Sequence, residues 1–331
     1  MSTSVRPVAI FGTGSYLPER VFRNEEFSKF IDTSDEWITQ RTGMKERRFA
    51  ADGQFTSDLA AEAGRRALAD AGWKGEDLDF VLLGTCTPDS LLPNTADWVH
   101  QALGCRETCG AIDIINACSS FTYGLAMVRA MVACGHINKG LVIGAEKLSQ
   151  FLDFEDRGSC ILFGDGAGAA CIGVSEDGRG DILACRLGAS FDFDSLNIAG
   201  GGSRVPASHE SVDTKRHKVS MNGRAIYKFA VSTLRDETRR VCEDAGVNLA
   251  DVKCIVPHQV NIRIIQSAME TLEFPMERVF INLDKYGNTS AASVPIALDE
   301  AARAGYFSRG DLVVLCAFGG GKAWGSQVIR W

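Results

Sequence analysis

Three residues suited to acyl-transfer chemistry stand at the ends of apolar segments in this sequence. Cys118 follows the apolar run 111–115, His258 follows the apolar run 254–256, and Asn288 precedes an alanine-rich helical segment. A cysteine thiolate can take an acyl group from a thioester. A histidine and an asparagine can donate hydrogen bonds to an enolate or carbonyl oxygen as charge builds there. Neither role requires a metal ion.

The pattern around Cys118 predicts a strand, a tight corner and a buried helix. Ala111–Ile115 is a short apolar run, and the four helical turns after Cys118 carry a single charge, Arg129. Apolar residues recur there at helical spacing: Phe121, Leu125, Val128 and Val132. Unpaired N–H groups and the positive end of the helix dipole then point at Cys118, so we expect them to favour its thiolate. The alternative is that Cys118 is one more small core residue, as free cysteines usually are.

Two pairs of similar segments indicate an internal duplication. Asp70-Ala71-Gly72 and Asp244-Ala245-Gly246 are separated by 174 positions (244 − 70), and each is followed by a linker and an apolar strand. Ala133-Cys134-Gly135 and Arg303-Ala304-Gly305 are separated by 170 positions (305 − 135), and a strand follows each. Alternating helices and strands predict two α/β halves with mainly parallel, mixed sheets covered by helices. Chance similarity among common α/β fragments is the alternative.

The duplication connects the three candidate residues. We expect one half at 1–178, carrying the cysteine, and a second at 179–331, carrying the histidine and the asparagine. Adding 170 to Cys118 gives Asn288, ahead of the matching helix. His258 stands at a carboxyl edge, where parallel sheets place their sites. If the halves pack about a pseudo-two-fold axis, all three residues converge on one cleft. The alternative for the histidine is a satisfied polar residue at a strand end.

Three glycine-containing segments have structural interpretations. Val8–Phe11 predicts a strand closed by Gly12-Thr13-Gly14, which lacks the third glycine of a dinucleotide-binding loop. Gly164–Gly168 runs into a strand and not a helix, so we expect a turn. Residues 186–222 are rich in glycine, serine and charge, which predicts a surface excursion with little regular structure.

Composition excludes several classes of protein. The 331 residues are 45% hydrophobic and 23% charged, and the net charge of −7 gives no global attraction to nucleic acid or anionic membranes. The N-terminal segment shows no signal-peptide pattern, and no run of 18 uncharged apolar residues exists. Eleven irregularly spaced cysteines favour a reducing cytoplasm over a disulfide scaffold. Cys105, Cys109 and nearby His100 are too few for a tetrahedral zinc site, so no metal is expected.

Eight motifs, in order and nearly from end to end, resemble the β-ketoacyl-acyl-carrier-protein synthase III family. They are Thr33-Ser34-Asp35-Glu36-Trp37-Ile38, Arg41-Thr42-Gly43, Ala117-Cys118, Asp156-Arg157-Gly158, Phe163-Gly164-Asp165-Gly166-Ala167-Gly168, Val256-Pro257-His258-Gln259, Gly287-Asn288-Thr289-Ser290 and Phe318-Gly319-Gly320-Gly321. The resemblance implies a thiolase fold, which is a five-layered αβαβα duplication, usually in a homodimer. It also implies the reaction, without any cofactor. An acyl-CoA starter acylates Cys118, malonyl-acyl-carrier protein loses carbon dioxide, and its carbanion attacks the acyl-enzyme.

The resemblance also assigns roles to residues in the catalytic centre. His258 and Asn288 would stabilise the enolate oxygen, and the backbone N–H groups of Cys118 and Gly320 would hold the acyl oxyanion. Phe318 would pack beside the histidine. For the glycine run after Phe318, chain flexibility alone is the alternative.

Further residues would bind the substrates. Trp37 and Arg157 would sandwich the adenine of CoA, Arg41 would meet its phosphates, and Asn261 would touch the pantetheine arm. Ordinary surface positions are the alternative for these side chains.

A carrier-protein surface is implied as well. Lys228 and Arg263 would belong to it, although Glu270 and Thr271 stand where the family has further basic residues. Lys322 places a charge where an apolar residue is common in the family.

Other functions remain open on the sequence. A relative on the same fold could use Cys118 for a secondary-metabolite condensation, such as loading a polyketide starter unit, or for another acyl transfer. A degradative thiolase needs a second cysteine near the C-terminal glycines, and the nearest is Cys316, inside an apolar strand. From other classes, a cysteine hydrolase using Cys118 and His258 and a catalytically silent scaffold are the alternatives.

Overall fold

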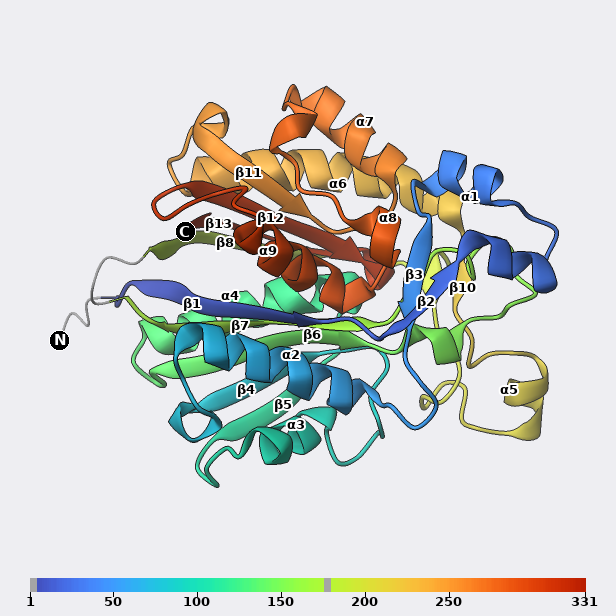
Figure 1. Cartoon of the computed structure of the whole chain (residues 1–331), viewed down its shortest axis with the longest axis horizontal. Coiled ribbons are helices and arrows are strands. Elements are labelled where there is room, and N and C mark those ends of the chain that lie inside the picture. The colour runs from blue at the N-terminus through green and yellow to red at the C-terminus, as the bar shows by residue number, and fades with distance from the viewer. Residues whose placement is uncertain (1–4, 176–179) are drawn as a thin grey trace.

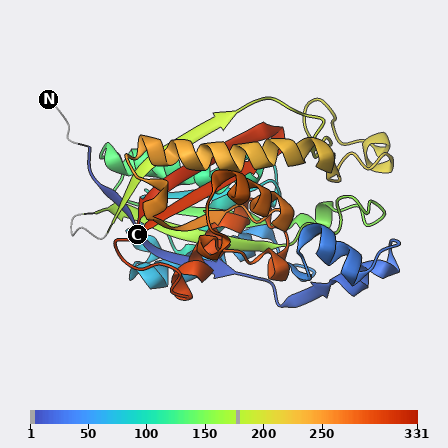
Figure 2. The same ribbon diagram turned by 90° about the horizontal axis from the view of Figure 1, so that it is seen from above.

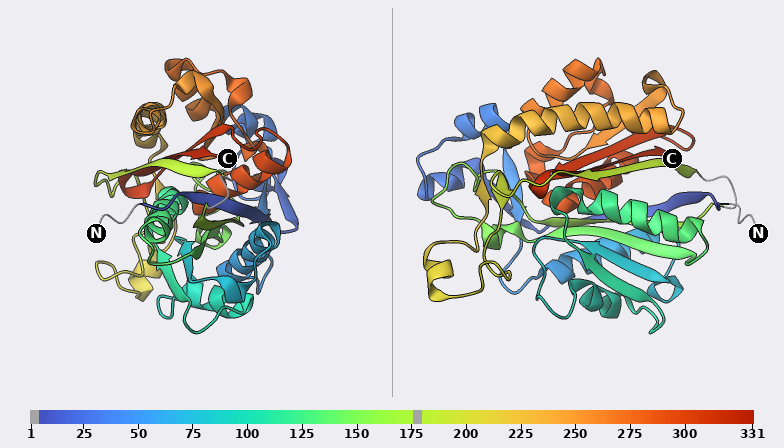
Figure 3. Two further views of the ribbon diagram at one scale, coloured as in Figure 1. Left: turned by 90° about the vertical axis from the view of Figure 1, so that its left-hand side faces the viewer. Right: turned by 180° about the vertical axis from the view of Figure 1, so that it is seen from behind.

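The computed structural model of the chain describes residues 5–175 and 180–331, which form five alternating layers of helices and sheets. Figure 1 shows two sheets with helices on their outer faces and between them. The views from the side and from behind show the same order of layers (Figure 3). This is the layered αβαβα arrangement that the family resemblance implies.

The first sheet has the strand order β1-β7-β6-β4-β5. These strands are β1 (Val8–Tyr16), β7 (Gly166–Val174), β6 (Lys139–Glu146), β4 (Phe80–Gly84) and β5 (Gly110–Ile114). Side chains alternate between its faces: Val81 and Leu83 pack under the outer helices, whereas Leu82 faces the central core. Both faces are therefore buried.

The second sheet repeats this order with strands from the other half of the chain. It runs β11-β12-β13-β8, with β11 (Val252–Pro257), β12 (Leu312–Gly319), β13 (Ala323–Arg330) and β8 (Asp181–Ala189). In place of a fifth strand, Val279 forms a single parallel bridge to Ile255. The matching order supports a duplication.

Helices cover each face of the two sheets. The outer pair on the first sheet is α2 (Thr56–Ala71) and α3 (Thr95–Leu103), the central pair is α4 (Ser120–Ala133) and α9 (Ser293–Arg303), and the outer pair on the second sheet is α6 (Gly223–Asp244) and α7 (Ile262–Leu272). Figure 2 shows α6 lying lengthwise along the second sheet. The predicted apolar stripe of α4 is buried in the central core with residues from both sheets.

Shorter elements gather at one end of the layers (Figure 1). They are the ribbon β2 (Arg20–Arg23) with β3 (Glu46–Phe49), helices α1 (Asp35–Thr42), α5 (His209–Asp213) and α8 (Leu283–Tyr286), and the ribbon β9 (Leu196–Asn197) with β10 (Ser220–Met221). They stand at the end where β12 finishes, and β9 and β10 each contribute a residue, Leu196 and Met221, to the pocket described below.

The sheets are mixed, as expected, but parallel pairs do not dominate them. In the first sheet β1–β7 and β7–β6 are antiparallel, whereas β6–β4 and β4–β5 are parallel. In the second, β11–β12 is parallel, whereas β12–β13 and β13–β8 are antiparallel. Among the described elements, no α-helix lies between β6 and β7 or between β12 and β13, so these pairs have no crossover helix of the kind that a parallel connection needs.

Glycines do not end β1 as predicted. The strand continues through Gly12 and Gly14 to Tyr16, and α2 packs directly on its backbone. A Cβ atom on Gly12 would lie 2.7 Å from the Ala67 carbonyl oxygen, and one on Gly14 would lie 2.6 Å from that of Ala63. These glycines therefore allow a close approach of helix and strand.

The turn expected at residues 164–168 and the surface excursion expected at residues 186–222 are each partly replaced by a strand. β7 already begins at Gly166, inside the segment expected to be a turn. The glycine at position 168 allows α9 to pack closely on this strand, since a Cβ there would meet the α9 backbone. The excursion predicted at 186–222 begins later, since β8 extends to Ala189 as the edge strand of the second sheet. The boundary predicted between residues 178 and 179 lies in the segment 176–179, outside the described residues.

The offset between the halves is 173 at the active-site turns, not 170. The 3-10 turns Ala117–Ser119 (η3) and Ser290–Ala292 (η7) precede α4 and α9, so the counterpart of Cys118 is Ala291. The value of 170 came from the C-terminal ends of these helices, and α4 has 14 residues where α9 has 11. Asn288 thus stands three residues before the true counterpart.

In the described part of the chain, no helix has both the length and the apolar character needed to cross a bilayer.

The contact between α2 and β1 gives a test of the fold. Replacing Gly14 with Ala should destabilise the protein by about 1–3 kcal/mol, because the new methyl group overlaps the α2 backbone. Gly202→Ala is the matched control, since nothing lies within 4 Å of its added Cβ. Urea unfolding measures both variants, and equal free energies of unfolding would show that α2 does not pack on this strand as described.

Candidate active site

Cys118, His258 and Asn288 line the same pocket, at the end of the molecule where the two sheets meet the shorter elements. Its remaining walls are mostly apolar and come from both halves: Leu162, Phe163, Ser195, Leu196, Met221, Ile226, Phe229, Val260, Phe318, Gly319, Gly320, Gly321 and Lys322. All three polar residues are at least 95% buried, with exposures of 5%, 1% and 4%. An apolar pocket with a few convergent polar groups is the usual form of a small-molecule site.

Cys118 is held in a strained turn between β5 and α4. Ala117 has φ of 48°, and its counterpart in the other half, Ser290, has φ of 49°. Non-glycine residues in this region carry strain and cluster at functional sites. The turn places Cys118 in the pocket wall directly ahead of a buried helix.

The end of β12 approaches the cysteine backbone very closely. A Cβ on Gly319 would lie 2.7 Å from the Cys118 nitrogen and 3.0 Å from the Ala117 Cβ. Only glycine fits at this position. The next residue, Gly320, also lines the pocket, so backbone groups of the two halves are adjacent at the cysteine.

The expectation that the helix terminus favours the thiolate of Cys118 is wrong for this environment. Burial raises the pKa of the thiol to about 12, and the buried carboxyl group of Glu146 acts in the same direction. A hydrogen bond with Ser290 opposes the shift but does not reverse it. The resting form at neutral pH is therefore the thiol.

Glu146 is a buried acid behind the cysteine that the sequence analysis missed. Its Oε1 and Oε2 accept hydrogen bonds from the Cys86 N–H, and Oε2 accepts one of 2.8 Å from the Thr87 hydroxyl. Burial raises its pKa above the usual value. The sequence signal was a lone acidic residue at the end of the apolar strand β6, which points to a satisfied buried group.

His258 follows β11 and is held by two hydrogen bonds. Its backbone N–H donates to the Cys316 carbonyl oxygen at 2.8 Å. The Nδ1 atom of its imidazole lies 2.6 Å from the Ser293 hydroxyl oxygen at the start of α9. Burial lowers the pKa of the imidazole to about 3, so it is neutral at physiological pH. The Phe318 ring packs edge-on against it, with centroids 5.4 Å apart. Ser293 has no sequence signal beyond its place in a helix-start motif.

Asn288 is oriented by the turn that follows it. Its Oδ1 accepts a 2.8 Å hydrogen bond from the Ser290 N–H, and its own N–H donates to the Leu162 carbonyl oxygen at 2.8 Å. Because the carboxamide oxygen is occupied, the NH₂ group is the part available to a ligand in the pocket.

Residues expected to bind a nucleotide lie together on the surface near α1. Ser34 caps α1 by accepting from the Trp37 N–H, as its motif predicts. The guanidinium groups of Arg41 and Arg157 each lie 4.7 Å from the Trp37 ring centroid. Arg157 also donates to the Asp32 carbonyl oxygen.

The other predicted surface residues lie on α6 and α7. Asn261 caps α7 and donates from Nδ2 to the Arg41 carbonyl oxygen at 3.1 Å. Arg263 is exposed, and both its Nε and Nη2 donate to the Gln40 carbonyl oxygen. Lys228 is exposed on α6, the neighbouring helix.

Lys322 is neutralised at the pocket wall. Its Nζ lies 2.6 Å from Asp192 Oδ2, and this contact is the main cause that holds the Asp192 pKa below its usual range. The unexpected charge is therefore compatible with the apolar lining.

The fold and this pocket define a class: cysteine-dependent condensing enzymes of the thiolase fold. Models of 3-oxoacyl-[acyl-carrier-protein] synthase III match residues 112–190, and its C-terminal model matches residues 242–331. β-Ketoacyl-[acyl-carrier-protein] synthase III of Caldanaerobacter subterraneus subsp. tengcongensis is 50% identical over 97% of both chains. The crystal structure of 3-oxoacyl-[acyl-carrier-protein] synthase III from Aquifex aeolicus is 43% identical, with a TM-score of 0.90 over 98% of this chain and 100% of that one.

A more distant structure represents another branch. The priming β-ketosynthase of the R1128 polyketide pathway is 30% identical, with a TM-score of 0.91 over 99% of this chain and 97% of that one. The chain belongs to the β-ketoacyl-[acyl-carrier-protein] synthase III family.

The raised pKa of Cys118 predicts the pH dependence of its alkylation. Only the thiolate reacts, so the rate with iodoacetamide should rise about tenfold for each pH unit from about pH 7 to 9. Peptide mapping assigns the rate to Cys118, with the Cys118→Ala protein as the blank. A rate that levels off below pH 8 would contradict a buried, protonated thiol.

Proposed function

We propose that this chain catalyses the decarboxylative condensation of an acyl-CoA starter with malonyl-acyl-carrier protein, which initiates fatty acid synthesis. The products are a β-ketoacyl-carrier protein, carbon dioxide and CoA. The observation that carries the proposal is the pocket that Cys118, His258 and Asn288 share, in a member of this family. A nucleophile and two hydrogen-bond donors around one cavity suit a two-step acyl transfer.

In the first step, the acyl group moves from CoA to Cys118. The sulfur–carbonyl bond to CoA breaks, a thioester to Cys118 forms, and the thiol proton ends on the CoA sulfur, so no net proton is consumed. The backbone N–H groups of Cys118 and Gly320 are the proposed donors to the carbonyl oxygen as it gains charge. The close approach at Gly319 brings their backbones side by side.

In the second step, the malonyl group loses carbon dioxide and its α-carbon attacks the acyl-enzyme. The enolate oxygen that forms takes hydrogen bonds from His258 and Asn288. When the Ser293 hydroxyl donates to Nδ1, the imidazole carries its proton on Nε2 and is a donor. Asn288 supplies its NH₂ group because its oxygen already accepts from Ser290.

The raised pKa of Cys118 helps to complete the cycle. Carbon–carbon bond formation releases the cysteine as a thiolate, and a thiol with a pKa of about 12 takes up a proton readily at neutral pH. The site then returns to its resting form.

CoA thioesters are substrates here, and the reaction requires no cofactor or metal. Trp37 and Arg157 are proposed to hold the adenine, Arg41 the phosphates and Asn261 the pantetheine arm. The Arg157 guanidinium lies over the indole at 4.7 Å, so an adenine between the two side chains requires Arg157 to move away.

The acidic carrier protein is proposed to dock near Lys228 and Arg263. Both side chains are exposed on neighbouring helices. Electrostatic steering toward an acidic partner needs such cations. Glu270 on α7 works against this attraction, so the docking surface is expected to centre on α6 and the start of α7.

A homodimer in a reducing cytoplasm completes the proposal. Among the described strands, β5 pairs only with β4 and is an edge of the first sheet. Ile112 and Ile115 on and after it are 39% and 72% exposed, and Leu91 and Leu92 nearby in sequence are each 86% exposed. An apolar edge strand is a ready surface for a second copy.

The alternative of a polyketide priming role is less well supported. The relative with that role is 30% identical, against 50% for a synthase III. Synthesis of acetoacetyl-carrier protein from acetyl-CoA and malonyl-carrier protein tests the proposal. Activity with malonyl-CoA but not with malonyl-carrier protein would favour the alternative.

Substitutions should separate the two steps. Cys118→Ala should abolish covalent acylation by labelled acyl-CoA. His258→Ala and Asn288→Ala should keep acylation and raise the barrier to condensation by about 2–4 kcal/mol, the usual effect of losing one oxyanion donor. Intact-mass spectrometry follows acylation, and product formation follows condensation.

Cys134→Ala is the matched control, since this cysteine is exposed and outside the pocket. Its rates should equal those of the parent protein. Equal loss of acylation in all three pocket variants would refute the division of roles.

The edge strand gives a separate prediction about assembly. Ile115→Asp should shift the protein from dimer to monomer, because the charge would be buried in the interface. Light scattering after size-exclusion chromatography measures the mass. Val5→Asp changes a residue of similar exposure, 73%, and should leave the dimer intact. An unchanged dimer in the Ile115 variant would place the interface elsewhere.

A further inference from the structure

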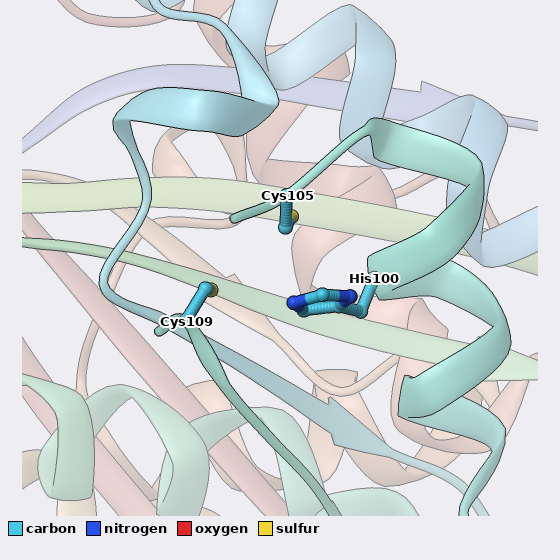
Figure 4. Close-up of side chains that lie close together, drawn as sticks. All are labelled: His100, Cys105 and Cys109. Atoms are coloured by element: carbon cyan, nitrogen blue, oxygen red, sulfur yellow. The ribbon is translucent and has the colours of Figure 1, made fainter. Parts of the chain in front are cut away.

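Three side chains with metal-binding atoms converge outside the pocket. The ligand atoms of His100, Cys105 and Cys109 all lie within 4.8 Å of one another. Figure 4 shows the imidazole and both thiols directed into a common space. Among the residues that the structure describes, this is the group of three or more His, Cys, Asp or Glu side chains whose ligand atoms lie close enough together to hold one ion.

The local backbone holds these three residues in place. His100 lies in the last turn of α3, and Gly104 ends the helix with φ of 69°. The Cys105 N–H then donates to the His100 carbonyl oxygen at 3.1 Å, and the Cys109 N–H donates to the Arg106 carbonyl oxygen at 2.9 Å. The ligands therefore come from one hydrogen-bonded corner between α3 and β5.

We propose that His100, Cys105 and Cys109 form a binding site for a thiophilic divalent cation of the zinc class, with water as the fourth ligand. Two thiolates and one imidazole are a ligand set that zinc uses when one tetrahedral position stays open. The sequence spacing alone offered too few ligands for a closed site. The structure adds the convergence of the three ligand atoms, which an open site requires.

The surroundings suit entry and binding of an ion. His100 and Cys105 are partly exposed, whereas Cys109 is 6% exposed, so the site opens to solvent on one side. The Arg106 guanidinium beside the site is paired with Asp79 at 3.1 Å, which offsets its repulsion of a cation.

The imidazole is also oriented by the same corner. His100 Nε2 lies 2.9 Å from the Arg106 carbonyl oxygen. A neutral imidazole that donates to this oxygen keeps a lone pair on its other nitrogen, and such outer contacts orient metal-binding histidines. Ring and loop are thus fixed relative to each other before an ion arrives.

The site lies at the end of β5 remote from the catalytic cysteine. Cys109 immediately precedes β5, and Cys118 follows its far end, so the five residues of the strand separate them by roughly 17 Å. A bound ion at this distance would fasten the start of the edge strand without touching the substrates. Its effect should therefore be on stability and not on turnover. The inference is independent of the condensation reaction.

Cobalt(II) is the probe for the test, used on the reduced, metal-free, full-length Cys118→Ala protein. This background removes the catalytic thiol as a competing ligand. One equivalent of cobalt should bind and give a thiolate-to-cobalt charge-transfer band together with the visible bands of a tetrahedral site. Zinc chloride should displace it and raise the melting temperature.

Variants at two of the three proposed ligands, His100 and Cys105, test whether the bands arise from this site. His100→Gln and Cys105→Ser, both at partly exposed positions, should each weaken cobalt binding more than the roughly 10–100-fold lost with an outer-shell partner. They should also remove the thermal shift with zinc. Cys134→Ser, at an exposed cysteine outside the cluster, should bind cobalt as the background protein does.

Two results would overturn the proposal. One is a cobalt spectrum that is the same in the His100 and Cys105 variants, which would place the ion elsewhere. The other is the absence of tetrahedral bands in the reduced protein, and a Cys105–Cys109 disulfide found by peptide mapping before reduction would then assign the pair to redox chemistry. Circular dichroism confirms that each variant is folded before it is scored.

Discussion

The two active-site turns each pack against a strand from the other half of the chain, and glycines make both contacts possible. A Cβ on Gly144 of β6 would lie 2.7 Å from the Ala291 carbonyl carbon in the second-half turn, and one on Gly319 of β12 would lie 2.7 Å from the Cys118 nitrogen in the first-half turn. Side chains at either strand position would separate the halves. The pocket can form because Gly144 and Gly319 have no side chains.

This packing also sets the chemistry of the pocket by removing water from it. Burial alone lowers the pKa of His258 to about 3, and it is the main cause that raises the pKa of Cys118 to about 12. Both groups therefore rest in their neutral forms. A neutral imidazole oriented by Ser293 is suited to donating a hydrogen bond, and a neutral thiol is stable until a thioester arrives. Hydrogen bonds with Ser290 and with the Cys118 backbone lower the pKa of the thiol but do not reverse the effect of burial.

Strands and helices whose formation depends on residues close in sequence could be predicted from local patterns. The strand ends before Cys118 and His258 and the buried face of α4 follow from apolar spacing and match the structure. Packing between distant segments was invisible to such patterns, so Gly12 and Gly168 were expected to end or precede strands that in fact include them. Asn288 was found through an offset that compares helix ends of unequal length. Its proximity to Cys118 could be established only by the fold.

The central claim is that one pocket holds the acyl-enzyme and the enolate at the same time, each against its own donors. The most direct measurement is a crystal structure of the protein acylated at Cys118 and bound to a malonyl-thioester analogue that cannot lose carbon dioxide. The account predicts the acyl oxygen within hydrogen-bond distance of the Cys118 and Gly320 N–H groups, and the analogue's thioester oxygen between His258 and Asn288. An analogue oxygen bound away from both side chains would contradict it.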